Sequence, residues 1–112
     1  MYGIGGNLIA EIQIGMPSTN AIGENINTWT TIQTIKGWLD YITGETNRTN
    51  FSAKIEESTH VFVADYIKLD SRINAEKARM VINHKIYDVT LIDNPMELNA
   101  QLEIYLRYVG GQ

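Results

Sequence analysis

The strongest constraint on the fold of this chain is an alternation of apolar and polar residues that repeats every two positions. Residues 8–14 place leucine, alanine and isoleucine at every second position, with glutamate and glutamine between them, and residues 101–108 alternate in the same way. Because successive side chains of an extended strand point to opposite faces, both segments predict half-buried β-strands. In the second segment we expect Leu102, Ile104, Leu106 and Tyr108 to point inward and Gln101, Glu103, Tyr105 and Arg107 outward.

The middle of the chain is rich in β-branched and aromatic residues. Residues 28–41 predict one long strand bent at Gly37, in which Trp38 lies on the face opposite Ile35. Residues 59–66 are mostly apolar on both faces, which is typical of a strand with neighbours on each side.

A hairpin is expected near residue 83. The β-rich runs 79–82 and 85–91 are separated by Asn83 and His84. Two residues is the length of a tight hairpin turn, and asparagine tolerates the positive φ that such a turn demands.

Three stretches break this pattern. Residues 15–27 contain glycines, asparagines and Pro17, so we expect an irregular loop there, and residues 42–50 predict a second polar loop. Residues 51–57 space Phe51 and Ile55 as on one side of a short helix. The sequence therefore predicts a mainly β fold: a small antiparallel β-barrel of five to six strands, with one short helix and long loops, formed by a single domain spanning residues 1–112.

Charge and composition exclude several classes of function. The chain has 13 acidic and 9 basic residues, a net charge of −4, which is the wrong sign for broad binding of a nucleic-acid backbone. It has no cysteine, so disulfides and thiolate metal sites are excluded. No secretion signal or membrane-spanning run is evident, and we expect synthesis in the cytoplasm.

The sequence offers no constellation for catalysis. His60 and His84 lack nearby carboxylates at metal-ligand spacing, and acidic pairs such as Glu56 and Glu57 have no local feature that would separate their pKa values. We therefore expect no enzyme activity, no metal and no cofactor.

The aromatic residues point to contacts between proteins. Trp29, Trp38 and the six tyrosines are not interleaved with basic residues, as base-stacking aromatics usually are. We predict that Trp29 and Trp38 lie at subunit interfaces, where tryptophan and tyrosine are enriched. The alternative is that Trp29, Trp38 and the tyrosines form a platform for a small ligand or carbohydrate.

The order of these features resembles the head-tail joining family of tailed bacteriophages. That family has a first strand with a glutamine, a tryptophan opening the second strand, a later aromatic, a threonine-histidine-apolar strand, and a final hairpin with a tyrosine. The matching residues are Ile12-Gln13-Ile14, Trp29, Trp38, Thr59-His60-Val61-Phe62-Val63, Arg79-Met80-Val81-Ile82 and Ile86-Tyr87-Asp88-Val89. They extend over nearly the whole chain.

The resemblance implies a structural protein of the phage virion. It implies a head completion (stopper) subunit that forms a ring at the portal-tail joint, closes the head after DNA packaging and connects it to the tail; the alternative is a tail completion protein at the same joint. The implied partners are the portal or adaptor ring, the tail completion protein, other copies of the chain, and the packaged DNA in the channel. The loop implied to face that channel is Ile42, Thr43, Gly44, Glu45, Thr46, Asn47, Arg48, Thr49 and Asn50.

Overall fold

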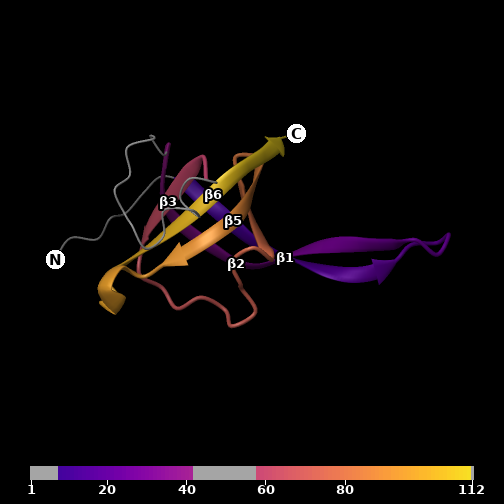
Figure 1. Ribbon diagram of the computed structural model, residues 1–112, viewed down its shortest axis with the longest axis horizontal. Helices are drawn as coiled ribbons and strands as arrows, with labels where there is room; N and C mark the ends of the chain where they lie inside the picture. The colour runs from indigo at the N-terminus through magenta and orange to yellow at the C-terminus, as the bar shows by residue number, and fades with distance from the viewer. Residues whose placement is uncertain (1–7, 42–57, 112) are drawn as a thin grey trace.

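The fold is an antiparallel sheet of six strands closed into a barrel (Figure 1). The computed structural model describes residues 8–41 and 58–111. The strands are β1 (Leu8–Thr19), β2 (Asn25–Tyr41), β3 (His60–Asp65), β4 (Ala78–Ile82), β5 (Lys85–Asp93) and β6 (Gln101–Gly111), and a 3₁₀ turn, η1 (Pro95–Glu97), precedes β6. Around the barrel the order is β1-β2-β3-β6-β5-β4, with β4 paired back to β1. The predicted six-stranded antiparallel β fold is confirmed; the predicted helix at 51–57 and the loop at 42–50 lie outside the described residues.

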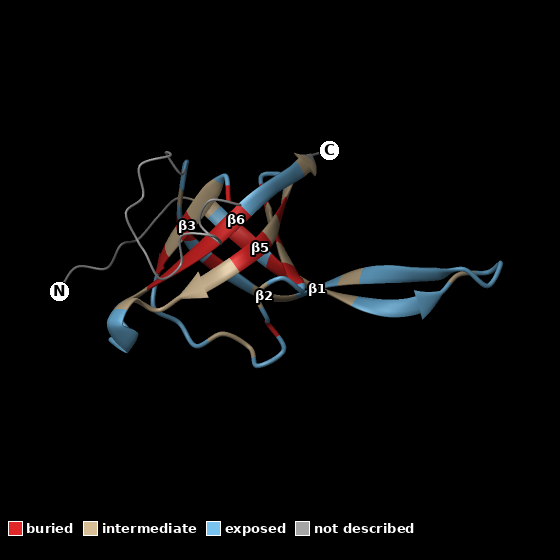
Figure 2. Ribbon diagram, in the orientation of Figure 1, coloured by how far each residue is buried: buried red, intermediate tan, exposed pale blue. Residues whose placement is uncertain are grey.

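The core fills the interior of the barrel with side chains from all six strands (Figure 2). The largest fully buried side chains are Phe62, Ile12, Met80, Ile82, Ile104, Leu106 and Val89. The alternation that predicted the first and last strands is therefore confirmed for their apolar faces.

The exposure expected along the last strand is wrong at three positions. Tyr108 is 45% exposed, because β6 continues beyond the packed interior. Glu103 and Tyr105 are buried on the face expected to be polar. The Tyr105 hydroxyl donates to Glu103 Oε1 at 3.0 Å and Gln101 Nε2 donates to Glu103 Oε2 at 2.9 Å, so the carboxylate keeps hydrogen-bond partners where water is excluded.

Residues 15–27 do not form the irregular loop that the sequence predicts. β1 and β2 stay paired as far as Thr19 and Asn25, and this hairpin extends out of the barrel as a two-stranded projection, hereafter the arm (residues 15–29; Figure 1). Pro17 pairs with Asn27 inside this hairpin. Proline is tolerated there because β4 pairs with β1 only up to Ile14, so the outer edge of β1 needs no backbone donor.

The predicted hairpin between β4 and β5 is confirmed. Asn83 and His84 both have positive φ, 50° and 65°. Two left-handed residues in succession match the turn type whose twist suits a two-residue hairpin.

Gly37 is the point of closest approach between β2 and β3. A β-carbon at this position would lie 2.4 Å from the Val63 carbonyl oxygen and 2.7 Å from Cε2 of Phe62. Only hydrogen fits between the backbone of β2 and the Phe62 ring at the centre of the core. The bend expected at Gly37 stays a prediction.

We predict that Gly37→Ala lowers the free energy of unfolding by about 1–3 kcal/mol or more, because the added methyl group must displace backbone as well as the Phe62 ring. The matched control is Gly110→Ala, where an added β-carbon meets nothing within 4 Å. Chemical denaturation of both variants measures the difference, and equal stability of the two would contradict the close approach.

Candidate functional site

The arm is exposed on both faces and carries little charge. Its apolar side chains Met16, Ile22 and Ile26 are 53%, 79% and 43% exposed. Glu24 is the one ionisable side chain among residues 15–29. Two-stranded hairpins are marginally stable in water without other packing, so a projection of this kind is suited to contact with another molecule.

The base of the arm is braced by Trp29. The Arg79 guanidinium lies 4.2 Å from the centre of the Trp29 ring, and Arg79 Nε donates to Gln13 Oε1 at 2.7 Å. A β-carbon on Gly15 would lie 3.3 Å from the same ring. Burial lowers the pKa of Arg79, and Asp88 opposes that shift. This stack packs the base of the arm against Arg79 of β4.

The two tryptophans predicted at interfaces do not share a site. Trp29 is half-buried at the base of the arm, whereas Trp38 is 44% exposed on the part of β2 that pairs with β3. They are nine positions apart along one strand, which corresponds to about 30 Å. A joint tryptophan platform for a carbohydrate is therefore wrong, and the assignment of each to an interface stays a prediction.

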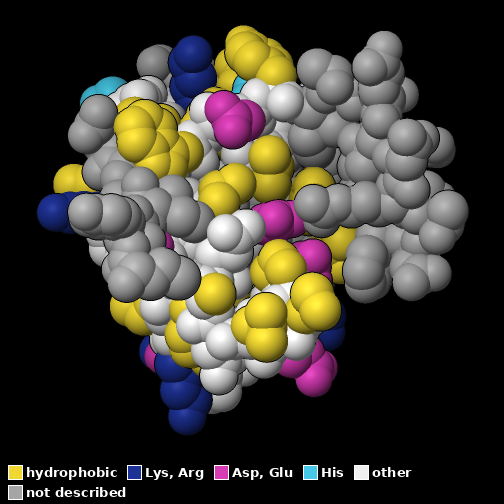
Figure 3. All heavy atoms as spheres, turned by 90° about the vertical axis from the view of Figure 1, so that its left-hand side faces the viewer, with side chains coloured by type: hydrophobic (Ala, Val, Ile, Leu, Met, Phe, Trp, Pro, Cys, Tyr) yellow, Lys and Arg dark blue, Asp and Glu magenta, His cyan; other side chains and the backbone are white. Residues whose placement is uncertain are grey.

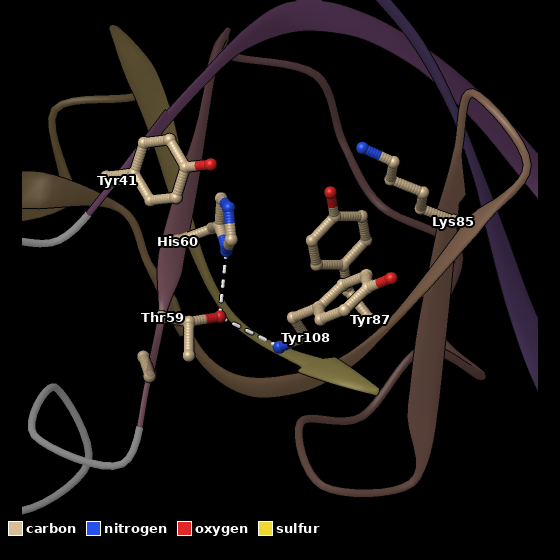
Figure 4. Close-up of a pocket in the computed structure, with 7 residues that line it drawn as sticks. Tyr41, Thr59, His60, Lys85, Tyr87 and Tyr108 are labelled. Atoms are coloured by element: carbon tan, nitrogen blue, oxygen red, sulfur yellow. Dashed lines mark hydrogen bonds between the residues drawn. The ribbon is translucent and has the colours of Figure 1, made fainter. Parts of the chain in front are cut away.

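A cavity of about 580 Å³ opens where four strands end, and tyrosines dominate its lining (Figure 4). We call it the tyrosine pocket. It is lined by Tyr41, Ser58, Thr59, His60, Lys85, Tyr87 and Tyr108. These residues come from the end of β2, the start of β3, the start of β5 and the end of β6, so no local sequence pattern could reveal the site.

The aromatic rings of the pocket pack around His60. Its ring centre is 4.5 Å from that of Tyr41, 5.1 Å from Tyr87 and 6.5 Å from Tyr108. Tyr87 is buried and forms the floor, whereas Tyr41 is 80% exposed at the rim. The Tyr87 and Tyr108 rings meet edge to face, with centres 5.5 Å apart. Such contacts hold the rings in fixed orientations.

Hydrogen bonds orient the histidine. Thr59 Oγ1 accepts from the backbone N–H of Tyr108 at 2.8 Å and lies 2.8 Å from His60 Nδ1. The other acceptor available to this hydroxyl, the Leu106 carbonyl, is 3.5 Å away. We therefore assign the Thr59 proton to the bond with Nδ1, which leaves the proton of the neutral imidazole on Nε2.

The pocket favours negative charge in a ligand. Burial and then the Lys85 ammonium lower the pKa of His60, so its ring is neutral at pH 7. Burial, with Tyr108 and Tyr41, raises the pKa of Tyr87, so its hydroxyl stays protonated. Among the described residues the lining contains one lysine and no acidic side chain, although the chain has a net charge of −4. Hydroxyl donors, aromatic faces and one ammonium group suit an acidic group with an apolar neighbour.

Two further findings concern the described residues alone. No group of three or more histidines, aspartates and glutamates among residues 8–41 and 58–111 is arranged to hold a metal ion. No helix in these two ranges is long and apolar enough to cross a membrane.

Among known proteins, the matches to this chain are solved structures with a similar fold. No family model and no curated protein matches it. Protein SF1141 from Shigella flexneri 2a is 18% identical, with 94% of each chain covered and a TM-score of 0.64. A chain of the virion of a native gene transfer agent particle is 11% identical, covering 94% of this chain and 98% of that one, with a TM-score of 0.57. A virion chain shares this fold. At these identities the likeness establishes the fold alone.

We predict that His60 makes stability depend on pH. The unfolded histidine takes up a proton near its ordinary pKa of 6.5, whereas the folded one does so at lower pH. The unfolded state therefore binds more protons between the two values, and the free energy of unfolding falls as pH drops through this window.

Denaturant titrations of the wild-type protein and of His60→Gln between about pH 7.5 and 5 measure this contribution. The free energy of unfolding should fall further in the wild-type protein than in His60→Gln, and the difference between the two declines is the part due to His60. His84→Asn, at an exposed turn position that keeps its positive φ, is the control and should behave as wild type. Identical pH profiles of wild type and His60→Gln would contradict the prediction.

Proposed function

We propose that this chain is a structural protein of a phage virion, a head completion (stopper) subunit that forms a ring at the portal-tail joint. The observation that carries the proposal is the arm. It presents Met16, Ile22 and Ile26 to solvent on a braced hairpin, which a barrel acting alone does not require. Projections of this kind join subunits, and a ring needs such a contact at every boundary.

Two further facts support this class of function. The fold is shared over nearly all of both chains with a component of a gene transfer agent virion. The net charge of −4 and the nearly uncharged arm suit contacts between proteins better than a grip on DNA. In the proposal the chain is not an enzyme, and DNA passes through or is held in a channel faced by residues 42–50. The portal or adaptor ring and the tail completion protein are its neighbours.

The tail completion role is the second form of the same proposal. The two forms differ in the partner that the subunit binds first, the portal end of a filled head or the end of a tail tube. Negative-stain images of the protein mixed separately with purified heads and with tails distinguish them.

A ligand-binding barrel is favoured by one observation, the tyrosine pocket. Tyrosine faces stack on sugar rings, and the hydroxyls and His60 Nε2 supply donors. Titration with neutral mono- and disaccharides, followed by tyrosine and tryptophan fluorescence, tests this alternative. Saturable binding that Tyr41→Ala, a change at the exposed rim of the pocket, abolishes would support it over the virion role.

We predict that shortening the arm removes assembly but preserves the barrel. Residues 16–28 are replaced by an Asn-Gly turn between Gly15 and Trp29, which keeps the Trp29–Arg79 stack. None of the removed side chains belongs to the core, so we expect a folded protein that fails to enter particles. Circular dichroism checks the fold, and electron microscopy counts joined, tailless and emptied heads.

The matched control for this deletion is Ser18→Ala, a small change at an exposed position of the arm. It should assemble as wild type does. Normal joining of heads and tails by the shortened protein would overturn the role of the arm.

A further inference from the structure

We propose that the tyrosine pocket of one subunit receives the arm tip of a second copy, with Ile22 among the tyrosine rings and Glu24 beside Lys85. This inference rests on the proposed function, because it names the contact that links neighbouring subunits of the ring. It assigns the pocket a ligand of definite chemistry: an acidic, apolar-tipped hairpin.

The pocket supplies one half of the match. Three tyrosine rings and the His60 ring give it an apolar interior with hydroxyl donors, and Lys85 gives it a positive rim. Figure 4 shows the Lys85 amine and the Tyr41 and Tyr87 hydroxyls directed toward the same open space. An isoleucine side chain next to a carboxylate fits both properties at once.

The arm tip supplies the other half. Ile22 is 79% exposed, and Glu24 follows it by two residues. Asn20 holds the tip in shape: its Oδ1 accepts from the backbone N–H groups of Ile22 at 3.1 Å and Glu24 at 2.9 Å. Because the tip is already ordered, binding loses less conformational entropy than the docking of a free loop would.

The contact must join different copies. Within one molecule the arm tip and Tyr41 lie at opposite ends of β2, a strand of 17 residues, and the arm projects away from the barrel (Figure 1). The arm tip and the pocket therefore lie far apart along the longest dimension of the molecule, which is 52 Å, so a subunit cannot fill its own pocket. A tip on one surface and a pocket on another make a heterologous contact, which closes into a ring or continues as an open chain.

A second exposed apolar group provides the competing site for the arm. Met96 and Leu98, in and beside η1, are 86% and 66% exposed at the end of the molecule opposite the arm (Figure 1). Figure 3 turns that end toward the viewer and shows exposed apolar side chains on it. Acidic Glu97 lies between the two apolar residues in the sequence, so Glu24 would meet a like charge there.

Disulfide trapping in the full chain tests the contact, since the natural sequence has no cysteine. Differently tagged Ile22→Cys and Tyr41→Cys proteins are mixed at high concentration and oxidised. We expect the pair Ile22→Cys and Tyr41→Cys to give a mixed dimer. Its yield should be several times that of the control pair, Ile22→Cys and Met96→Cys. An equal or greater yield with Met96→Cys, or no mixed dimer with Tyr41→Cys, would overturn the proposal.

Charge reversal tests the same contact without cysteine. Glu24→Lys and Lys85→Glu should each weaken self-association about tenfold, and mixing the two variants should restore it. Sedimentation velocity measures association, and thermal unfolding confirms that both variants fold. The pairing of Glu24 with Lys85 would be overturned if self-association is weakened in the variants and is not restored in the mixture. It would also be overturned if neither variant weakens self-association.

Failure of this contact is distinguishable from failure of the proposed function. If Glu24→Lys joins heads to tails as wild type does and no trapping occurs, the arm contact is wrong but the virion role stands. If trapping succeeds while the protein is absent from purified particles, the contact stands as a route of self-association and the virion role is wrong.

Discussion

The antiparallel pairing of β1 with β2 is the interaction on which the rest of the molecule depends. Its inner half supplies two walls of the barrel and buries Ala10, Ile12 and Ile35. Its outer half continues into solvent as the arm. The Trp29–Arg79 stack marks the change between the two, because beyond it β1 has lost β4 as a neighbour. One hairpin therefore provides both the stability of the fold and the surface for contact.

The fold could be predicted from the sequence where burial dictates the pattern. Alternation identified the apolar faces of β1 and β6, and Asn83 identified the turn between β4 and β5. The arm was missed because proline and asparagine normally end strands, whereas a hairpin with free outer edges tolerates both. The burial of Glu103 was missed for a different reason. Alternation with a period of two shows which face of a strand is polar, but it cannot show whether other parts of the protein cover that face.

The tyrosine pocket could not be predicted, for a different reason. Its members are Tyr41, His60, Tyr87 and Tyr108, each on a separate strand of the adjacent run β2-β3-β6-β5, and they meet because Tyr41 pairs with His60 and Tyr87 with Tyr108. The sequence did single out the tyrosines as a group, but their grouping depends on strand order rather than spacing. The pairing of β3 with β6 brings His60 opposite Leu106 and next to Tyr108. The pocket is therefore a product of topology.

A contact between one arm tip and one pocket buries little area, and small interfaces give weak pairwise affinity. In a ring each subunit makes this contact twice, once with its arm and once with its pocket. Closing the ring makes the last contact intramolecular, and a template that holds subunits side by side raises their effective concentration before closure. Weak single contacts therefore suit a subunit that must stay dispersed, helped by its net charge of −4, until its assembly site is present.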